Sequence, residues 1–471
     1  MTMTSQTTYN NRSTWIGREG VAALAPKVSG DLLRPGDAAF EAATELWNGT
    51  IRRRPALIVR PASADEVSAA VRFAARVGAP VAVRSGGHNV AGFAMCDDGV
   101  VIDLSAMNSV KVDPERRLAR AGGGATWGDL DRATQPHGLA APGGLVSKTG
   151  IGGLTLGGGL GWMRRQHGLS CDNLASVEIV TADGEIRRAS EEENPDLFWG
   201  IRGGGGNFGV VTEFDYNLHP IGPEVMFAFV LYPLEDGLGV LQGWRAFCDA
   251  APDEVSSVVL CGTAPGADPF PPDVQGRQFV AIAAVHSGLP EEGERVMRPL
   301  RVLGRPLCDF SERSPYVEVQ SAFDEDYPDG GRYYWKSLYL DRFDDAVIEG
   351  VLELAASRPS PLSTVDVWQL GGAMSRIGPD ATAFGPRDAP YLLGVEANWI
   401  DPAEDETNRQ WTREACARMS GFSTQTSYLN FEPDPMAISP PQSPRQVRLA
   451  ALKRRYDPDN LFRNNHAIAP A

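Results

Sequence analysis

The chain has 471 residues, of which 42% are hydrophobic and 22% charged, which is the composition of an ordinary globular protein of several domains. Its formal net charge of −16 argues against nucleic acid and anionic membranes as partners, because both repel an acidic surface. The sequence contains no apolar run of about 18 residues that predicts a membrane-spanning helix. Residues 1–15 lack the pattern of a signal peptide.

The cysteines and histidines give no sign of a metal or disulfide framework. The six cysteines are scattered and form no CxxC pair, and the histidines show no metal-ligand spacing. We therefore expect reduced thiols, a cytoplasmic location and no bound metal.

Short apolar runs bounded by proline or glycine predict the strands of the first half of the chain. They lie at 55–61, 79–83, 100–104, 110–113, 117–121 and 208–218, and residues 177–186 predict a strand, a turn and the start of a return strand. Helices are expected at 39–47, from Ser63 as N-cap to Val77, from Thr126 as N-cap to Pro136, and from Asn194. This order is typical of an α+β fold rather than of consecutive βαβ units.

Glycine becomes less frequent after a predicted boundary near Pro220, and strand-like and helix-like segments then alternate. The strands are expected at 226–232, 279–285, 365–370 and 391–399. The helices are expected at 238–250, 290–303, 346–356 and 405–419, and a last helix at 444–456. The pattern predicts a second layered α+β domain.

The turn at 84–88, Arg-Ser-Gly-Gly-His, ends a strand-like run and places a histidine after two glycines. Glycine lets bare backbone N–H groups approach an anion, so this turn predicts contact with a phosphate-bearing cofactor. Glycine turns at 122–124, 143–161 and 203–206 predict several loops around one extended cofactor. A nicotinamide GxGxxG site is disfavoured, because a loop and not a strand precedes Gly150. The P-loop pattern GxxxxGK[ST] is absent.

Several segments together carry a family resemblance: Arg84 to His88, Val101 to Leu104, Thr149 to Gly161, Cys171 to Asn173, Gly203 to Gly209 and Tyr456 to Asn464. Residues 55–220 resemble the flavin domain of the vanillyl-alcohol-oxidase/p-cresol-methylhydroxylase superfamily. The C-terminus resembles the terminal element of berberine-bridge-enzyme-like oxidases. The resemblance implies an α+β protein with a two-subdomain FAD-binding PCMH-type fold and an α+β substrate domain with an antiparallel sheet.

The implied domains follow the chain in order. Residues 1–52 form the N-terminal tail and the first part of the FAD domain, 53–222 the FAD-binding domain, 223–420 the substrate domain, and 421–471 a berberine-bridge-like element that returns to the FAD domain.

The resemblance also implies FAD as the cofactor, joined covalently to His88. Many relatives form a second bond through a cysteine five residues before the Ile-Gly-Gly triplet, where this chain has Val146, so we expect a single bond. The implied cofactor-binding residues are Arg84, Ser85, Gly86, Gly87, His88, Asn89, Gly92, Gly143, Gly144, Thr149, Gly150, Gly152, Gly153, Gly157, Gly158, Gly159, Gly161, Asn173, Ile179, Val180 and Asn464.

Two side chains are implied in the chemistry. Tyr428, followed by Leu429 and Asn430, matches a family tyrosine that removes the substrate proton as a phenolate. Free tyrosine has a pKa near 10, so a phenolate needs a cation or hydrogen-bond donors nearby, and Arg387 and Lys336 are candidates. Thr149 stands near the oxygen-reactive position of the flavin, where relatives often carry valine. Its hydroxyl is expected either to alter the reaction with oxygen or to cap the loop.

We therefore expect an FAD-linked oxidase that takes hydride from an alcohol, sugar, phenolic or secondary-metabolite substrate, with oxygen as the acceptor. A dehydrogenase and a flavin-dependent oxygenase on the same scaffold remain open, as does a flavin- or sugar-binding protein without turnover. Aromatic side chains on strand-like segments of the middle domain suit a planar or sugar-like ligand. They are Tyr333, Tyr334, Trp335, Tyr339, Trp368, Tyr391 and Trp399.

Overall fold

The computed structural model describes residues 16, 18–435 and 443–471, so most of the expected N-terminal tail, 1–15 and 17, lies outside the described residues. A first sheet has the strand order β1-β2-β4-β3. Its strands are β1 (Leu32–Leu33), β2 (Leu57–Val59), β3 (Val81–Arg84) and β4 (Val100–Asp103). Both β2 and β3 run parallel to β4, so β3 delivers the turn that begins at Ser85 to one end of the sheet.

The helices of this region begin where the sequence predicts. Helix α3 (Ala64–Val77) starts at Ser63, whose side chain accepts a hydrogen bond from the backbone N–H of Glu66. It ends at Gly78 in the left-handed conformation that favours glycine. Helix α1 covers Arg18–Leu24, and α2 (Phe40–Thr44) is shorter than the helix expected at 39–47.

A second sheet has the antiparallel order β5-β6-β10-β8-β9. Its strands are β5 (Val110–Asp113), β6 (Leu118–Gly122), β8 (Leu174–Val180), β9 (Ile186–Ser190) and β10 (Val210–Asn217). Helix α4 (Trp127–Thr134) begins with a capping box between Thr126 and Asp129, and α7 (Pro195–Ile201) follows β9. The segment 143–161, expected as a turn, contains the short helix α5 (Ile151–Leu156). Helix α6 (Arg164–His167) follows it.

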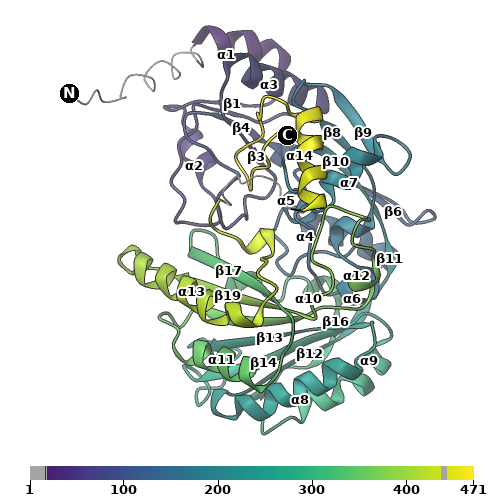
Figure 1. The fold of residues 1–471 in the computed structure, drawn as a ribbon, viewed down its shortest axis with the longest axis vertical. Coiled ribbons are helices and arrows are strands. Elements are labelled where there is room, and N and C mark those ends of the chain that lie inside the picture. The colour runs from purple at the N-terminus through teal and green to yellow at the C-terminus, as the bar shows by residue number, and fades with distance from the viewer. Residues whose placement is uncertain (1–15, 17, 436–442) are drawn as a thin grey trace.

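The large third sheet has eight strands and lies below the first and second sheets in Figure 1. Its order is β15-β12-β14-β13-β18-β19-β17, with β16 paired to β12. The strands are β12 (Glu224–Pro233), β13 (Val255–Thr263), β14 (Gln278–His286), β15 (Cys308–Asp309), β16 (Glu312–Pro315), β17 (Arg332–Leu340), β18 (Thr364–Gln369) and β19 (Tyr391–Trp399). The antiparallel sheet of the middle region is thus confirmed.

Helices pack against one face of the third sheet and bury its apolar side chains. They are α8 (Gly237–Ala250), α9 (Pro290–Met297), α11 (Asp345–Ala356) and α13 (Asp405–Met419). The helix expected at 290–303 ends at Met297, where Pro299 in the following turn provides no backbone N–H to continue it. Successive strand residues alternate between faces, so Val259, Val365 and Val395 join the helix-side core. The opposite face of the third sheet faces the glycine-rich turns.

The C-terminal helix α14 (Pro444–Tyr456) lies beside α7 in the upper part of Figure 1, far from α13, which precedes it in sequence. Leu449, Leu452 and Tyr456 belong to the same core cluster as Leu197 and Trp199 of α7. The last residues therefore pack against elements that lie more than half the chain earlier. Among the described helices, none combines the length and the apolar character needed to cross a membrane.

Candidate active site

A cavity lies between the glycine-rich turns and the face of the third sheet opposite α8, α9, α11 and α13. Its empty volume is about 2040 Å³, including open solvent at its mouth. Residues predicted from the sequence that line it are Ser85, Gly86, Gly87, His88, Asn89, Gly144, Thr149, Gly150, Gly152, Gly153, Gly157, Tyr428 and Asn464. Segments from both ends of the chain thus meet at one site.

The other predicted cofactor-binding residues do not line this cavity. They are Arg84, Gly92, Gly143, Gly158, Gly159, Gly161, Asn173, Ile179 and Val180. Arg84 donates to the Ala43 carbonyl (2.9 Å) and lines a neighbouring hollow with Lys148. Ile179 and Val180 are core residues of β8.

The remaining glycines in that group are required by close packing. A Cβ on Gly143 would lie 2.3 Å from the Trp127 ring, and one on Gly161 would lie 1.5 Å from the Gly143 carbonyl oxygen. Gly92 has a φ of +69°. Their sequence signal therefore arises from backbone conformation and packing rather than from a place on the cavity wall.

The turn after β3 offers backbone donors to the cavity. The N–H groups of Gly86, Gly87 and His88 have no acceptor in the part of the chain that the structure describes. A Cβ on Gly86 would lie 2.3 Å from the Gly150 nitrogen, so two of the glycine turns touch directly. Consecutive free N–H groups are a binding site for phosphate oxygens.

The C-terminal segment adds polar atoms that also lack partners. Buried Asn465 Oδ1 and His466 Nδ1 find no hydrogen bond within the described ranges, and both residues line the cavity. Free donors at one end and unpaired amide and imidazole atoms further along fit an extended cofactor that carries phosphate and a polar ring.

His88 is held as a neutral imidazole. Burial lowers the pKa of His88 to about 4. The Trp47 ring stacks on the His88 ring with a centroid distance of 5.2 Å. The Tyr333 ring stacks on Trp47 with a centroid distance of 3.8 Å. Thr149 Oγ1 lies 3.5 Å from His88 Nδ1, so its hydroxyl faces the histidine. Val146 also lines the cavity.

Tyr428 is buried at the start of a 3-10 turn, Leu429–Phe431, and its hydroxyl oxygen accepts several hydrogen bonds. The donors are the backbone N–H of Gly159 (3.1 Å), the backbone N–H of Leu160 (3.3 Å) and Asn430 Nδ2 (2.8 Å). Burial nevertheless raises the pKa of Tyr428 to about 12, while these donors act to lower it. Three donors suit a phenolate, which offers more acceptor capacity than a hydroxyl.

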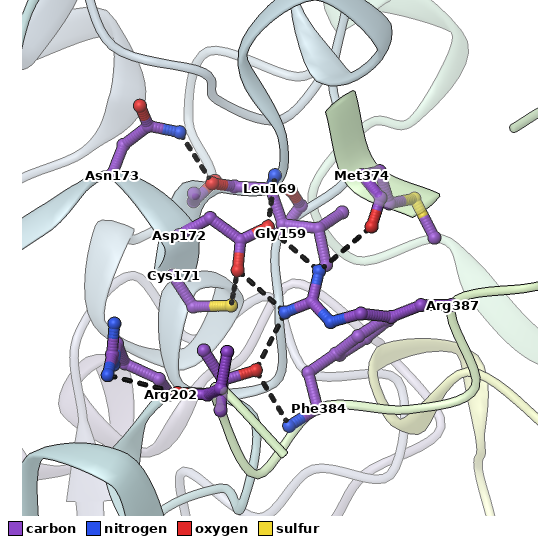
Figure 2. Close-up of polar contacts among 12 residues, drawn as sticks. Gly159, Leu169, Cys171, Asp172, Asn173, Arg202, Met374, Phe384 and Arg387 are labelled. Carbon is purple, nitrogen blue, oxygen red and sulfur yellow. Dashed lines mark hydrogen bonds and ion pairs between the residues drawn. The ribbon is translucent and has the colours of Figure 1, made fainter. Parts of the chain in front are cut away.

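Neither cation expected beside Tyr428 contacts it. Lys336 pairs with Glu432 (2.5 Å). Figure 2 shows the Arg387 guanidinium directed at the Asp172 carboxylate, which it contacts at 2.6 and 3.1 Å. The expectation for both cations is corrected: their charges are already balanced by nearby carboxylates.

Arg387 acts on the glycine segment instead. Asp172 also accepts a hydrogen bond from the Leu169 N–H (2.9 Å). In the same loop, the Ser170 N–H donates to the Gly159 carbonyl (3.0 Å) and the Cys171 N–H donates to the Gly158 carbonyl (2.9 Å). The ion pair thereby fixes the backbone that donates to Tyr428. In the same view Asn173 turns its amide to the Leu169 carbonyl (2.8 Å), so it stabilises this loop.

The third sheet supplies the opposite wall. Among the predicted aromatic residues, Trp335 and Trp368 line the cavity, as do Asp366 and Glu396, which were not predicted. Tyr391 instead joins the helix-side core. A sequence signal was available: along β18 and β19 the acids occupy alternate positions between apolar residues, which places them on the face opposite the helices.

A buried ion pair ties the C-terminal segment to the fourth glycine turn. Lys453 and Asp457 are fully buried and lie 2.6 Å apart. Lys453 Nζ also donates to the carbonyls of Asn207 and Phe462, each at 2.9 Å, and Asp457 accepts from the N–H groups of Leu461 and Phe462. The pair therefore positions residues that border the cavity.

Replacing Lys453 by methionine is expected to lower the free energy of unfolding by about 3–5 kcal/mol, because it leaves the Asp457 charge buried without its partner. Arg455→Met on the same helix removes an exposed pair with Asp196 and is expected to cost less than about 1 kcal/mol. Urea unfolding followed by circular dichroism measures both. Equal losses in the two variants would contradict a special role for the buried pair.

Comparisons with known proteins match this architecture. The model of an FAD binding domain matches residues 55–190, and the model described as berberine and berberine like matches residues 447–469. Fold and site together define an FAD-linked oxidoreductase with a PCMH-type FAD-binding domain.

The chain belongs to the family of berberine-bridge-like FAD-linked oxidases. It is 33% identical over 458 residues to (R)-6-hydroxynicotine oxidase of Paenarthrobacter nicotinovorans, covering 94% of this chain and 97% of that protein. An FAD-linked oxidoreductase of Dictyostelium discoideum is 31% identical over 458 residues, with 96% and 97% covered.

Solved structures agree. The crystal structure of 6-hydroxy-D-nicotine oxidase from Arthrobacter nicotinovorans superimposes with a TM-score of 0.84 at 31% identity, covering 94% of this chain and 98% of that one. Chitooligosaccharide oxidase shares the fold with a TM-score of 0.82 at 23% identity, covering 96% and 100%.

Proposed function

We propose that the protein is a covalently flavinylated oxidase, with FAD joined to His88 by a single bond and oxygen as the electron acceptor. The observation that carries this proposal is that Tyr428 lines the same cavity as His88, whose turn has free backbone N–H groups. The neutral imidazole of His88 has the lone pair that bond formation requires. Val146 offers no thiol for a second bond.

The proposed roles of the domains follow their order along the chain. We propose that residues 53–222 bind FAD, 223–420 bind the substrate, and 421–471 return to complete the cofactor site. Of the predicted contacts, those that line the cavity are the ones we assign to FAD. A cytoplasmic location stays a prediction.

The chain's own groups then act as follows. FAD, when bound, supplies the hydride acceptor. The N–H groups of Gly86, Gly87 and His88 bind phosphate oxygens, and Asn464, Asn465 and His466 bind polar atoms along the cofactor. Tyr428 removes the proton from the substrate, and the Gly159, Leu160 and Asn430 donors stabilise the resulting negative charge on its oxygen. We propose that Thr149 positions His88 through its hydroxyl.

Anaerobic mixing of the purified protein with a panel of alcohols, sugars, phenols and aromatic amines tests this function. We expect the visible absorbance of the oxidised flavin to fall with one class of compound and to recover on admission of air, with hydrogen peroxide formed. Bleaching without recovery in air would instead identify a dehydrogenase. The absence of any flavin spectrum would contradict the proposal.

A further inference from the structure

Asp366 on β18 and Glu396 on β19 bring two carboxyl groups together in the wall opposite the glycine turns. Asp366 pairs in register with Gly394, two residues before Glu396 on the same face. A Cβ on Gly394 would lie 3.6 Å from Asp366 Cβ and 3.7 Å from Glu396 Oε1. Because Gly394 has no side chain, there is space for both acidic side chains beside it. The two carboxyl groups are close enough there for each to change the pKa of the other.

This pair is buried and makes no ion pair within the part of the chain that the structure describes. Asp366 is 1% exposed and Glu396 2%, and neither takes part in an ion pair with any described residue. The nearby cation Arg358 donates to the Thr263 hydroxyl and the Ala355 carbonyl instead. The Tyr327 hydroxyl donates to Glu396 Oε2 (2.9 Å), whereas Asp366 Oδ1 receives no hydrogen bond from a donor group of the described chain.

One proton shared between the acids leaves one negative charge. Burial and the neighbouring acid raise the pKa of Glu396 well above its usual range, and burial raises that of Asp366 to about 7. Glu396 therefore keeps its proton to higher pH than Asp366, and Asp366 is the acid of the pair that ionises first. A buried charge of this kind costs several kcal/mol unless an opposite charge compensates it.

Aromatic rings line the same cavity as the pair. Trp335 stands opposite Glu396 in the sheet register, and Phe431 lies with its ring 5.6 Å from Trp335 and 6.1 Å from Trp368. All three rings line the cavity. Ring faces attract organic cations as well as flat ligands.

We propose that the Asp366–Glu396 pair binds the ammonium group of a cationic aromatic amine, which the rings of Trp335, Trp368 and Phe431 enclose. A neutral alcohol or sugar leaves the Asp366 charge uncompensated, so the site prefers the cation. The proposal rests on the oxidase function for its biological meaning, but the binding step requires no turnover.

Binding to the oxidised holoprotein is measured by tryptophan fluorescence with two probes of similar size. Benzyltrimethylammonium is a permanent cation without the nitrogen lone pair that hydride loss requires, and benzyl isopropyl ether is neutral. We expect the wild type to bind the cation at least about tenfold more tightly, because attraction to the carboxyl pair and cation–π contact with the rings act on the cation alone. Equal affinities, or a preference for the ether, would overturn the proposal without any variant.

Asp366→Asn keeps the shape and removes the charge. We expect it to weaken binding of the cation at least about tenfold and binding of the ether less than about threefold. Asp131→Asn is the matched control, because Asp131 is also a buried acid, with a pKa raised to about 7, and it does not line the cavity. It should leave both affinities unchanged. An equal loss for both probes in Asp366→Asn would assign the pair a structural role and overturn the proposal. Flavin reduction in the substrate panel decides the oxidase function separately.

Discussion

Replacing Tyr428 by phenylalanine is expected to slow anaerobic flavin reduction about 100- to 10,000-fold, the range contributed by a positioned proton acceptor. Gly159, Leu160 and Asn430 all donate hydrogen bonds to the phenol oxygen of Tyr428, and phenylalanine has no acceptor for them. Flavin content should remain that of the wild type, because the ring itself still fills its site. Stopped-flow absorbance with the substrate found in the panel measures the rate.

Tyr339→Phe controls for the loss of a buried hydroxyl. Tyr339 is fully buried, and its hydroxyl has no partner among the described residues, so the variant should reduce its flavin at the wild-type rate. The pH profile separates chemistry from packing. A proton acceptor with a pKa of about 12 becomes more abundant as pH rises, so the wild-type rate should increase with pH and the rate of Tyr428→Phe should not. A wild-type rate in Tyr428→Phe would remove this residue from the mechanism.

His88→Ala should abolish covalent flavin. After acid precipitation, we expect nearly all of the yellow colour of the wild type to stay with the pellet and nearly all of that of the variant to enter the supernatant. The physical reason is that His88 is the one nucleophile the proposal places against the flavin, since Val146 stands where a thiol would be needed. Absorbance of both fractions gives the answer.

His137→Ala is the appropriate control, because this histidine is exposed and lies outside the cavity. Its pellet should retain the colour. Colour that stays with precipitated His88→Ala would show that another residue forms the bond.

The fold was largely predictable because its signals are local. Ser63 and Thr126 cap their helices through contacts within a single turn, and the helix-side face of the third sheet follows from alternation along each strand. The exceptions also have local causes. The segment 143–161 contains α5 despite its glycines, and Pro299 shortens the helix that begins at Pro290.

The site was predictable only in part, because glycine serves two purposes. Gly86 and Gly150 bring two turns into contact at the cavity, whereas Gly143 makes room for Trp127 and Gly161 makes room for the backbone of Gly143. Sequence spacing does not separate these cases. The same limit applies to charges: Arg387 was one candidate cation for Tyr428, but its partner Asp172, distant in sequence, determines where it points.

Alternation along each strand places Asp366 and Glu396 on the face opposite the helices, but it does not show that the two carboxyls meet. Asp366 and Glu396 meet because β18 and β19 are neighbours in the sheet and because Gly394 leaves space between them. Each acid alone resembles an ordinary strand residue. Their meeting at one cavity, without an ion pair to any described residue, emerges only from the register of the two strands.

The mass of the intact wild-type protein, with peptide mapping, tests the central claim most directly. We expect the chain to be heavier than its sequence by one FAD, with the added mass on the peptide that contains His88 and none on the peptide that contains Val146. A mass equal to that of the unmodified sequence, or FAD found on a different residue, would contradict the account.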